Sequence, residues 1–159
     1  MRNILLNFYR VTSYVLVGLL LHAGEVFAAD SIQEKTVVLA LGDSLTAGFG
    51  VDAEENFPSR LQVKIDNAGL ICKVVNAGVS GDTTAGGVRR INWLMKHKPQ
   101  IVILALGAND GLRGLSTEEM RSNLETMIRI SQEHGARVLL AGMKALPNYG
   151  EDYILKFES

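Results

Sequence analysis

An apolar run that ends abruptly at Gly42-Asp43-Ser44 constrains the fold of this chain more than any other feature. Residues Val37 to Leu41 are all aliphatic, which is typical of a strand buried on both faces of a parallel sheet. In α/β proteins, sites lie at the carboxyl ends of such strands, where the chain leaves the sheet. Ser44, followed by Gly48 and Gly50, therefore has the position of a nucleophile on a tight strand-to-helix turn.

Apolar runs of this kind alternate with helical periodicity along the rest of the chain. The expected strands are Val37–Leu41, Ile71–Val75, Ile101–Leu106 and Arg137–Ala141. The expected helices begin at Phe57-Pro58, around Val88, at a Ser116 or Thr117 cap, and at Glu151. Strands that alternate with helices, joined by right-handed crossovers, predict an α/β fold. We expect a flavodoxin-like three-layer α/β/α sandwich around a doubly wound parallel sheet.

The first 28 residues are interpreted as a signal peptide. Arg2 and Arg10 precede an apolar stretch from Val11 to Leu21, and small residues lead to an expected cleavage site after Ala28. The stretch is short for a transmembrane helix, and a retained N-terminal anchor is the alternative. We expect a signal peptide at 1–28, a linker at 29–36 and one domain at 37–159. The protein would then be periplasmic or secreted, with no stable membrane span after cleavage.

Composition narrows the class of function. The 159 residues include 16 basic and 17 acidic ones, so net charge does not favour a nucleic-acid partner. The single cysteine excludes an internal disulfide. The three histidines are scattered through the sequence and form no motif such as H-E-x-x-H. We therefore expect neither a metal nor another cofactor.

Three strand ends supply residues for an acyl-transfer site. Because the carboxyl ends of parallel strands meet at one edge of a sheet, Ser44, Gly81 and Asn109 are expected to lie together. A serine that attacks a carbonyl carbon needs hydrogen-bond donors for the resulting oxyanion. The backbone N–H groups of Ser44 and Gly81 and the side-chain amide of Asn109 are the candidate donors.

Each of these motifs has a plainer interpretation. Asp43-Ser44 and Ser80–Thr84 are typical of helix caps, and Asn109-Asp110-Gly111 is typical of a turn. Their occurrence at three successive strand ends favours a site. A phosphate-binding site is less favoured, because the chain has neither a P-loop lysine nor a G-x-G-x-x-G motif.

The same residues resemble a known family. Gly42–Leu45, Ser80–Thr83 with Gly81, and Gly107–Asp110 resemble blocks I, II and III of the SGNH (GDSL) hydrolases. Asn109–Gly114 and Leu146–Gly150 resemble its branch of periplasmic arylesterases, thioesterases and lysophospholipases. The resemblance runs from about Val37 to Tyr153.

The resemblance implies a serine hydrolase that cleaves small acyl esters or thioesters, or lysophospholipids, through an acyl-Ser44 intermediate. Ser44 would be the nucleophile, and Ser44, Gly81 and Asn109 would form the oxyanion hole. Asp43 and Asp110 would be supporting residues, because an aspartate alone is a poor substitute for an imidazole base.

The family has its catalytic Asp and His in a D-x-x-H block near the carboxyl terminus, expected after the last residue of this chain, Ser159. None of the three histidines fits that role. His22 lies in the expected signal peptide, and His97 and His134 precede strands, at the opposite edge of the sheet. We therefore expect a domain that is incomplete at its carboxyl end and prone to aggregate. A non-catalytic binding remnant of the same fold is the alternative to a hydrolase.

Overall fold

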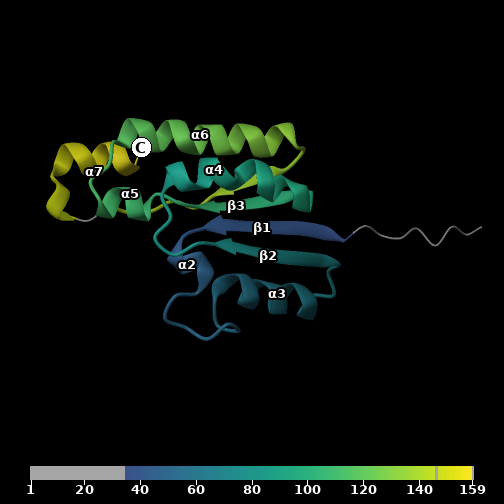
Figure 1. Cartoon of the computed structure of the whole chain (residues 1–159). Coiled ribbons are helices and arrows are strands. Elements are labelled where there is room, and N and C mark those ends of the chain that lie inside the picture. Colours follow the sequence, from purple (N-terminus) through teal and green to yellow (C-terminus); the bar gives the residue numbers. More distant parts are fainter. Residues whose placement is uncertain (1–34, 146, 159) are drawn as a thin grey trace, which may run out of the picture. The chain divides into compact units, whose positions relative to one another are not determined.

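A computed structural model describes residues 35–145 and 147–158 of the chain (Figure 1). The expected signal peptide, residues 1–28, and most of the expected linker lie outside the described residues, so both remain predictions. From Lys35 onward the chain forms one compact unit. Within that described part, every helix is too short or too polar to cross a membrane.

Four parallel strands form a single sheet. In spatial order they are β2 (Cys72–Gly78), β1 (Thr36–Gly42), β3 (Ile101–Ala105) and β4 (Arg137–Leu140). The two strands with the most continuous apolar runs, β1 and β3, occupy the centre. Leu39, Leu41 and Val102 on these strands are completely buried. This strand order is that of the flavodoxin-like doubly wound sheet, which confirms the predicted fold class.

Helices cover both faces of the sheet and complete the three layers. Figure 1 shows α3 (Phe57–Asn67) on one side and α4 (Thr84–Leu94) with α6 (Thr117–Glu133) on the other. Ile91, Leu94 and Met127 of α4 and α6 join the buried strand residues in one core. The remaining short elements are α2 (Ser44–Ala47), η1 (Met95–His97), α5 (Ala108–Leu112), η2 (Pro147–Tyr149) and α7 (Glu151–Glu158).

Side-chain caps determine where the helices begin. The side chains of Asp43, Asn56, Thr83 and Ser116 accept hydrogen bonds from backbone N–H groups in the first turns of α2, α3, α4 and α6. Each cap satisfies a donor that has no acceptor within its helix. At the other end of α6, Gly135 has a φ of +82°, a conformation that glycine adopts without steric cost. The helix expected to begin at a Ser116 or Thr117 cap is confirmed, with Ser116 as the cap.

The second strand is longer than its apolar pattern indicated. We predicted a strand at Ile71–Val75, but β2 runs from Cys72 to Gly78. The reason is its neighbour: Ala40, Leu41 and Gly42 of β1 pair with Asn76, Ala77 and Gly78 in parallel register. Such pairing depends on the neighbouring strand and not on the composition of β2. The loop that leads to α4 therefore begins only at Val79.

The outermost strand of the sheet, β4, has exposed apolar side chains. Leu139 is 60% exposed and Leu140 is 47% exposed. Among the described residues, no strand pairs with the outer side of β4. An unpaired apolar strand edge is a template for pairing with another molecule.

The 159-residue polypeptide is therefore expected to self-associate through β4, with a mass by light scattering that rises with concentration. The substitution Leu139→Lys should shift the polypeptide toward the monomer, because lysine on an edge strand opposes strand pairing. Val63→Lys is the matched control, because Val63 is similarly exposed but lies on α3. Helix α3 packs against β2, which is the strand at the opposite side of the sheet from β4. A monomeric wild type at every concentration would contradict the prediction.

Candidate active site

Ser44 lies at the first position of α2, directly after β1. The preceding residue, Asp43, is only 1% exposed, and its Oδ1 accepts a hydrogen bond from the Leu45 N–H at 3.0 Å. The Gly48 N–H donates to the Ser44 carbonyl at 3.0 Å and ends the turn. The cap interpretation of Asp43 is thus correct, and the cap is what holds the half-buried Ser44 at the strand end.

Gly81 lies in the loop between β2 and α4. Its φ of +77° is in the left-handed region that favours glycine. Val79, at the start of this loop, donates its N–H to the Gly42 carbonyl at 3.0 Å. This bond connects the Gly81 loop to the end of β1, immediately before Asp43 and Ser44.

Asn109 connects the Ser44 and Gly81 segments. Its Nδ2 donates to the Asp82 carbonyl at 2.9 Å and to Asp43 Oδ2 at 3.4 Å. Asp43 precedes Ser44 and Asp82 follows Gly81, so the three predicted residues do lie at one edge of the sheet. The surrounding residues Asn109-Asp110-Gly111 form part of the short helix α5, and not the strand-end loop or simple turn that we considered.

Two of the proposed donors are without acceptors. Among the described residues, neither the Ser44 N–H nor the Gly81 N–H has a hydrogen-bond acceptor. The third donor, the Asn109 amide, makes one short bond and one long one. A bond of 3.4 Å is weak, so a ligand oxygen can replace Asp43 at that hydrogen. The site therefore has three N–H donors available to a ligand: two without acceptors and one whose second acceptor is weak.

The Asp110 side chain links the two helices α5 and α4 next to the site. It is 3% exposed, and its two carboxylate oxygens accept hydrogen bonds from the Thr84 N–H at 2.9 Å and the Thr84 hydroxyl at 2.6 Å. The Asn123 amide donates to the same hydroxyl at 3.1 Å. Asp110 thus binds α5 to the start of α4, and the hydrogen bonds of its carboxylate go to Thr84 and not to Ser44.

Sequence reasoning missed two residues that shape this edge. A Cβ atom on Gly78 would overlap backbone atoms of Thr46 and Ala47, so a glycine is what allows α2 to lie against the end of β2. Arg90 of α4 donates hydrogen bonds to backbone carbonyls at the ends of both β1 and β2. In the sequence, Gly78 and Arg90 carry no distinctive signal, because their partners lie in other segments.

His97 and His134 lie at the opposite edge of the sheet, as predicted, and His22 lies outside the described residues. His97 is in η1, before β3, where its ring makes an edge contact with Trp93 at 5.8 Å between centroids. His134 follows α6, before β4, and its Nδ1 lies 2.8 Å from the Ile130 carbonyl oxygen. Within residues 35–145 and 147–158, no cluster of three or more His, Cys, Asp or Glu side chains is arranged to hold a metal ion.

The segment after α5 is held by two tyrosines. The Tyr149 hydroxyl donates to the Leu112 carbonyl at 2.7 Å, and the Tyr153 hydroxyl donates to the Leu115 carbonyl at 3.0 Å. Burial raises the pKa of Tyr153, and the nearby Tyr149 and Asp110 raise it further. Because only the neutral hydroxyl donates, this bond persists at neutral pH and is lost only above the ordinary tyrosine range.

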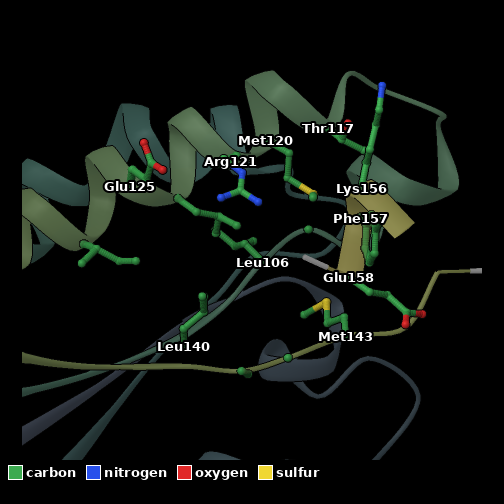
Figure 2. Close-up of a pocket in the computed structure, with 15 residues that line it drawn as sticks. Leu106, Thr117, Met120, Arg121, Glu125, Leu140, Met143, Lys156, Phe157 and Glu158 are labelled. Carbon is green, nitrogen blue, oxygen red and sulfur yellow. The ribbon is translucent and has the colours of Figure 1, made fainter. Parts of the chain in front are cut away.

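A cavity of about 260 Å³ lies beside the site, between the ends of β3 and β4 and the helices α6 and α7. Figure 2 shows Leu106, Met120, Met143 and Phe157 around it. Its rim includes the charged side chains of Arg121, Glu125, Lys156 and Glu158. Lys156 Nζ lies 3.5 Å from Glu118 Oε1. The pKa of Glu118 is lowered by a backbone hydrogen bond, by the Ser116 hydroxyl, by Lys156 and by the Thr117 hydroxyl. Ser44, Gly81 and Asn109 do not line this cavity.

A flavodoxin-like sheet with a serine, a glycine N–H and an asparagine amide at its carboxyl edge is the arrangement expected of an SGNH hydrolase. The chain belongs to the GDSL-like Lipase/Acylhydrolase family, whose model matches residues 40–155. This match confirms the family resemblance seen in the sequence.

Three known proteins illustrate the similarity. The chain is 41% identical over 121 residues to Esterase TesA of Pseudomonas aeruginosa, covering 76% of this chain and 60% of that protein. It is 37% identical to Thioesterase 1/protease 1/lysophospholipase L1 of Escherichia coli strain K12, covering 73% and 55%. It is 44% identical to the crystal structure of AlinE4, an SGNH-hydrolase family esterase, with a TM-score of 0.75 and coverage of 80% and 69%. The chain thus spans 55–60% of the length of these two curated relatives.

Proposed function

We propose that this protein is a serine hydrolase of small carboxylic esters or thioesters, with Ser44 as its nucleophile. The observation that supports this most directly is the group of N–H donors at one sheet edge: two without acceptors and one with a weak acceptor. The names of the relatives, which include esterase and thioesterase, are in agreement.

In the proposed reaction, Ser44 Oγ attacks the carbonyl carbon of the ester and loses its proton to a base. The carbonyl oxygen becomes an oxyanion and accepts hydrogen bonds from the Ser44 N–H, the Gly81 N–H and the Asn109 amide. The alcohol or thiol leaves with a proton, and water then hydrolyses acyl-Ser44. His97 and His134 lie at the other edge of the sheet, so the base is assigned to the D-x-x-H block that the family resemblance implies.

Exposed apolar side chains next to the donors support an acyl or aryl substrate. Leu45 is 72% exposed, Phe49 81%, Val79 48% and Leu112 58%. Leu45 follows the nucleophile, and Val79 and Leu112 belong to the segments that contain Gly81 and Asn109. Lysophospholipids and short acyl esters both have apolar chains that such a surface can contact. The pattern of residues 1–28 supports a periplasmic or secreted protein as part of the same proposal.

The proposal is tested on the full-length product of the gene with p-nitrophenyl butyrate and with a fluorophosphonate, which forms a covalent tetrahedral adduct with an activated serine. We expect ester hydrolysis and one phosphonyl group on the peptide that contains Ser44. Ser44→Ala should abolish both, whereas Ser122→Ala, at an exposed position of α6, should change neither. Hydrolysis retained by Ser44→Ala would exclude this nucleophile. A folded wild type that neither hydrolyses nor reacts would favour the non-catalytic binding alternative.

A further inference from the structure

Arg90 contacts three segments near Ser44 and Gly81: the end of β1, the end of β2 and the loop that follows β2. Its Nη2 donates to the Gly42 carbonyl at the end of β1 at 3.0 Å, and its Nη1 donates to the Ala77 carbonyl near the end of β2 at 2.6 Å. Its Nε binds Asp82 Oδ2, in the loop that follows, at 2.8 Å. The Arg90 side chain is 20% exposed and that of Asp82 is 11% exposed, so these contacts are largely shielded from water and weakly screened by salt.

The chemistry of arginine suits this position. A guanidinium group presents five N–H donors in one rigid plane, so it can bind three acceptors in fixed directions. A lysine ammonium has the same charge on a flexible stem but concentrates its donors at one atom. A lysine at position 90 can therefore preserve the charge without preserving the three-way geometry.

A glycine one helical turn before Arg90 makes room for its partner. A Cβ atom on Gly86 would overlap the carboxylate of Asp82. Gly86 and Arg90 are four residues apart and lie on the same face of α4. Gly86 leaves space for the Asp82 carboxylate, and Arg90 binds that carboxylate. Both residues on this face of α4 therefore fit the position of Asp82.

The Gly81 loop is held from two sides. On the α5 side, Arg113 Nη2 donates to the Gly81 carbonyl at 2.9 Å, and Asn109 donates to the Asp82 carbonyl. On the strand side, the Asp82 carboxylate is bound by Arg90, which also binds the ends of β1 and β2. Gly81 has no side chain of its own for attachment. The position of its N–H relative to Ser44 therefore depends on these neighbouring contacts.

We propose that Arg90 is a positioning residue for the oxyanion hole: it fixes the Gly81 N–H relative to Ser44 by binding Asp82 and the Gly42 and Ala77 carbonyls together. Its effect on catalysis rests on the proposed function. Its effect on the loop does not, because that effect is a property of the folded chain. The two effects are measured separately.

The structural arm compares amide hydrogen exchange in Arg90→Lys and Arg89→Lys. Arg89 is the adjacent, exposed arginine of the same helix and is the matched control. We expect exchange at the Val79 and Asp82 amides, which donate to the Gly42 and Val79 carbonyls, to accelerate about tenfold in Arg90→Lys, because charge-assisted hydrogen bonds to a partly buried carboxylate are lost. Arg89→Lys should leave exchange unchanged. Unchanged exchange in Arg90→Lys, or an equal acceleration over the whole chain, would overturn the proposal.

A second pair of measurements keeps the test decisive if Arg90→Lys folds poorly. Asp82→Asn, which removes the charge but keeps the size of the side chain, should accelerate exchange in the same residues. In Arg90→Ala, added guanidinium ion should restore exchange protection of the Val79 and Asp82 amides, whereas an equal concentration of sodium chloride should not. Failure of both results would overturn the proposal.

The kinetic arm uses the full-length protein and p-nitrophenyl butyrate. Arg90→Lys should lower kcat about tenfold with little change in KM, because misplaced oxyanion donors weaken binding of the transition state and not of the substrate. A change confined to KM would overturn the catalytic part of the proposal. If the wild type hydrolyses no ester, the proposed function fails, while the exchange measurements still decide whether Arg90 positions the loop.

Discussion

Replacing Asn109 with alanine should lower kcat for ester hydrolysis about 10²–10³-fold, because one oxyanion donor is typically worth about 2.7–4 kcal/mol of the barrier. The amide now donates to the Asp82 carbonyl at 2.9 Å and, weakly, to Asp43 Oδ2 at 3.4 Å. The oxyanion would replace Asp43 as the second acceptor. Because this bond strengthens only as charge develops on the oxygen, its loss should appear in kcat more than in KM.

The measurement is steady-state hydrolysis by the full-length protein, with Asn67→Ala as the control. Asn67 is an exposed residue at the end of α3 and should tolerate the change without loss of rate. Thermal melting of both variants separates a catalytic loss from unfolding, since Asn109 also holds the Gly81 loop through Asp82. An unchanged kcat in a folded Asn109→Ala variant would remove this residue from the oxyanion hole.

Gly78→Ala is expected to lower the free energy of unfolding by about 3 kcal/mol, at the upper end of the usual range for overpacked sites. The added methyl group would overlap the Ala47 nitrogen and the Thr46 carbonyl carbon, which are backbone atoms of α2. A clashing side chain can rotate away, but a clashing backbone has to move as a unit. The move would shift α2 away from the end of β2 and displace Ser44 at its first position.

Urea denaturation of Gly78→Ala and Gly142→Ala provides the comparison. A Cβ atom on Gly142 would meet no heavy atom within 4 Å, so that variant should change the unfolding free energy by no more than about 0.5 kcal/mol. If both variants lose the same free energy, the close approach of α2 to β2 is not what requires a glycine at position 78.

The central strands were predictable because burial on both faces leaves a direct signature in the sequence. β1 and β3 have continuous aliphatic runs, and both occupy the middle of the sheet. The short helix α5 was not predicted, because an element of five residues is too brief to show a helical period. The four-residue helix α2 was indicated only by its cap at Asp43. The extension of β2 to Gly78 was missed because pairing with β1 determines it.

The candidate site was predictable in part for a similar reason. Parallel strands bring their carboxyl ends to one edge, so the order of the motifs was enough to place Ser44, Gly81 and Asn109 together. The contacts between them were not predictable. Asp43 and Asp110 are both buried, yet one caps α2 and the other binds Thr84 at the start of α4.

The sequence by itself determined the fold class, the family and the edge at which the polar residues gather, since these follow from hydrophobic burial and chain order. Only the tertiary structure decided how that edge is held together. Arg90 binds carbonyls of Gly42 and Ala77, and Gly78 meets the backbone of α2. Backbone groups are the same in every residue, so no sequence pattern indicates which of them a distant side chain will contact.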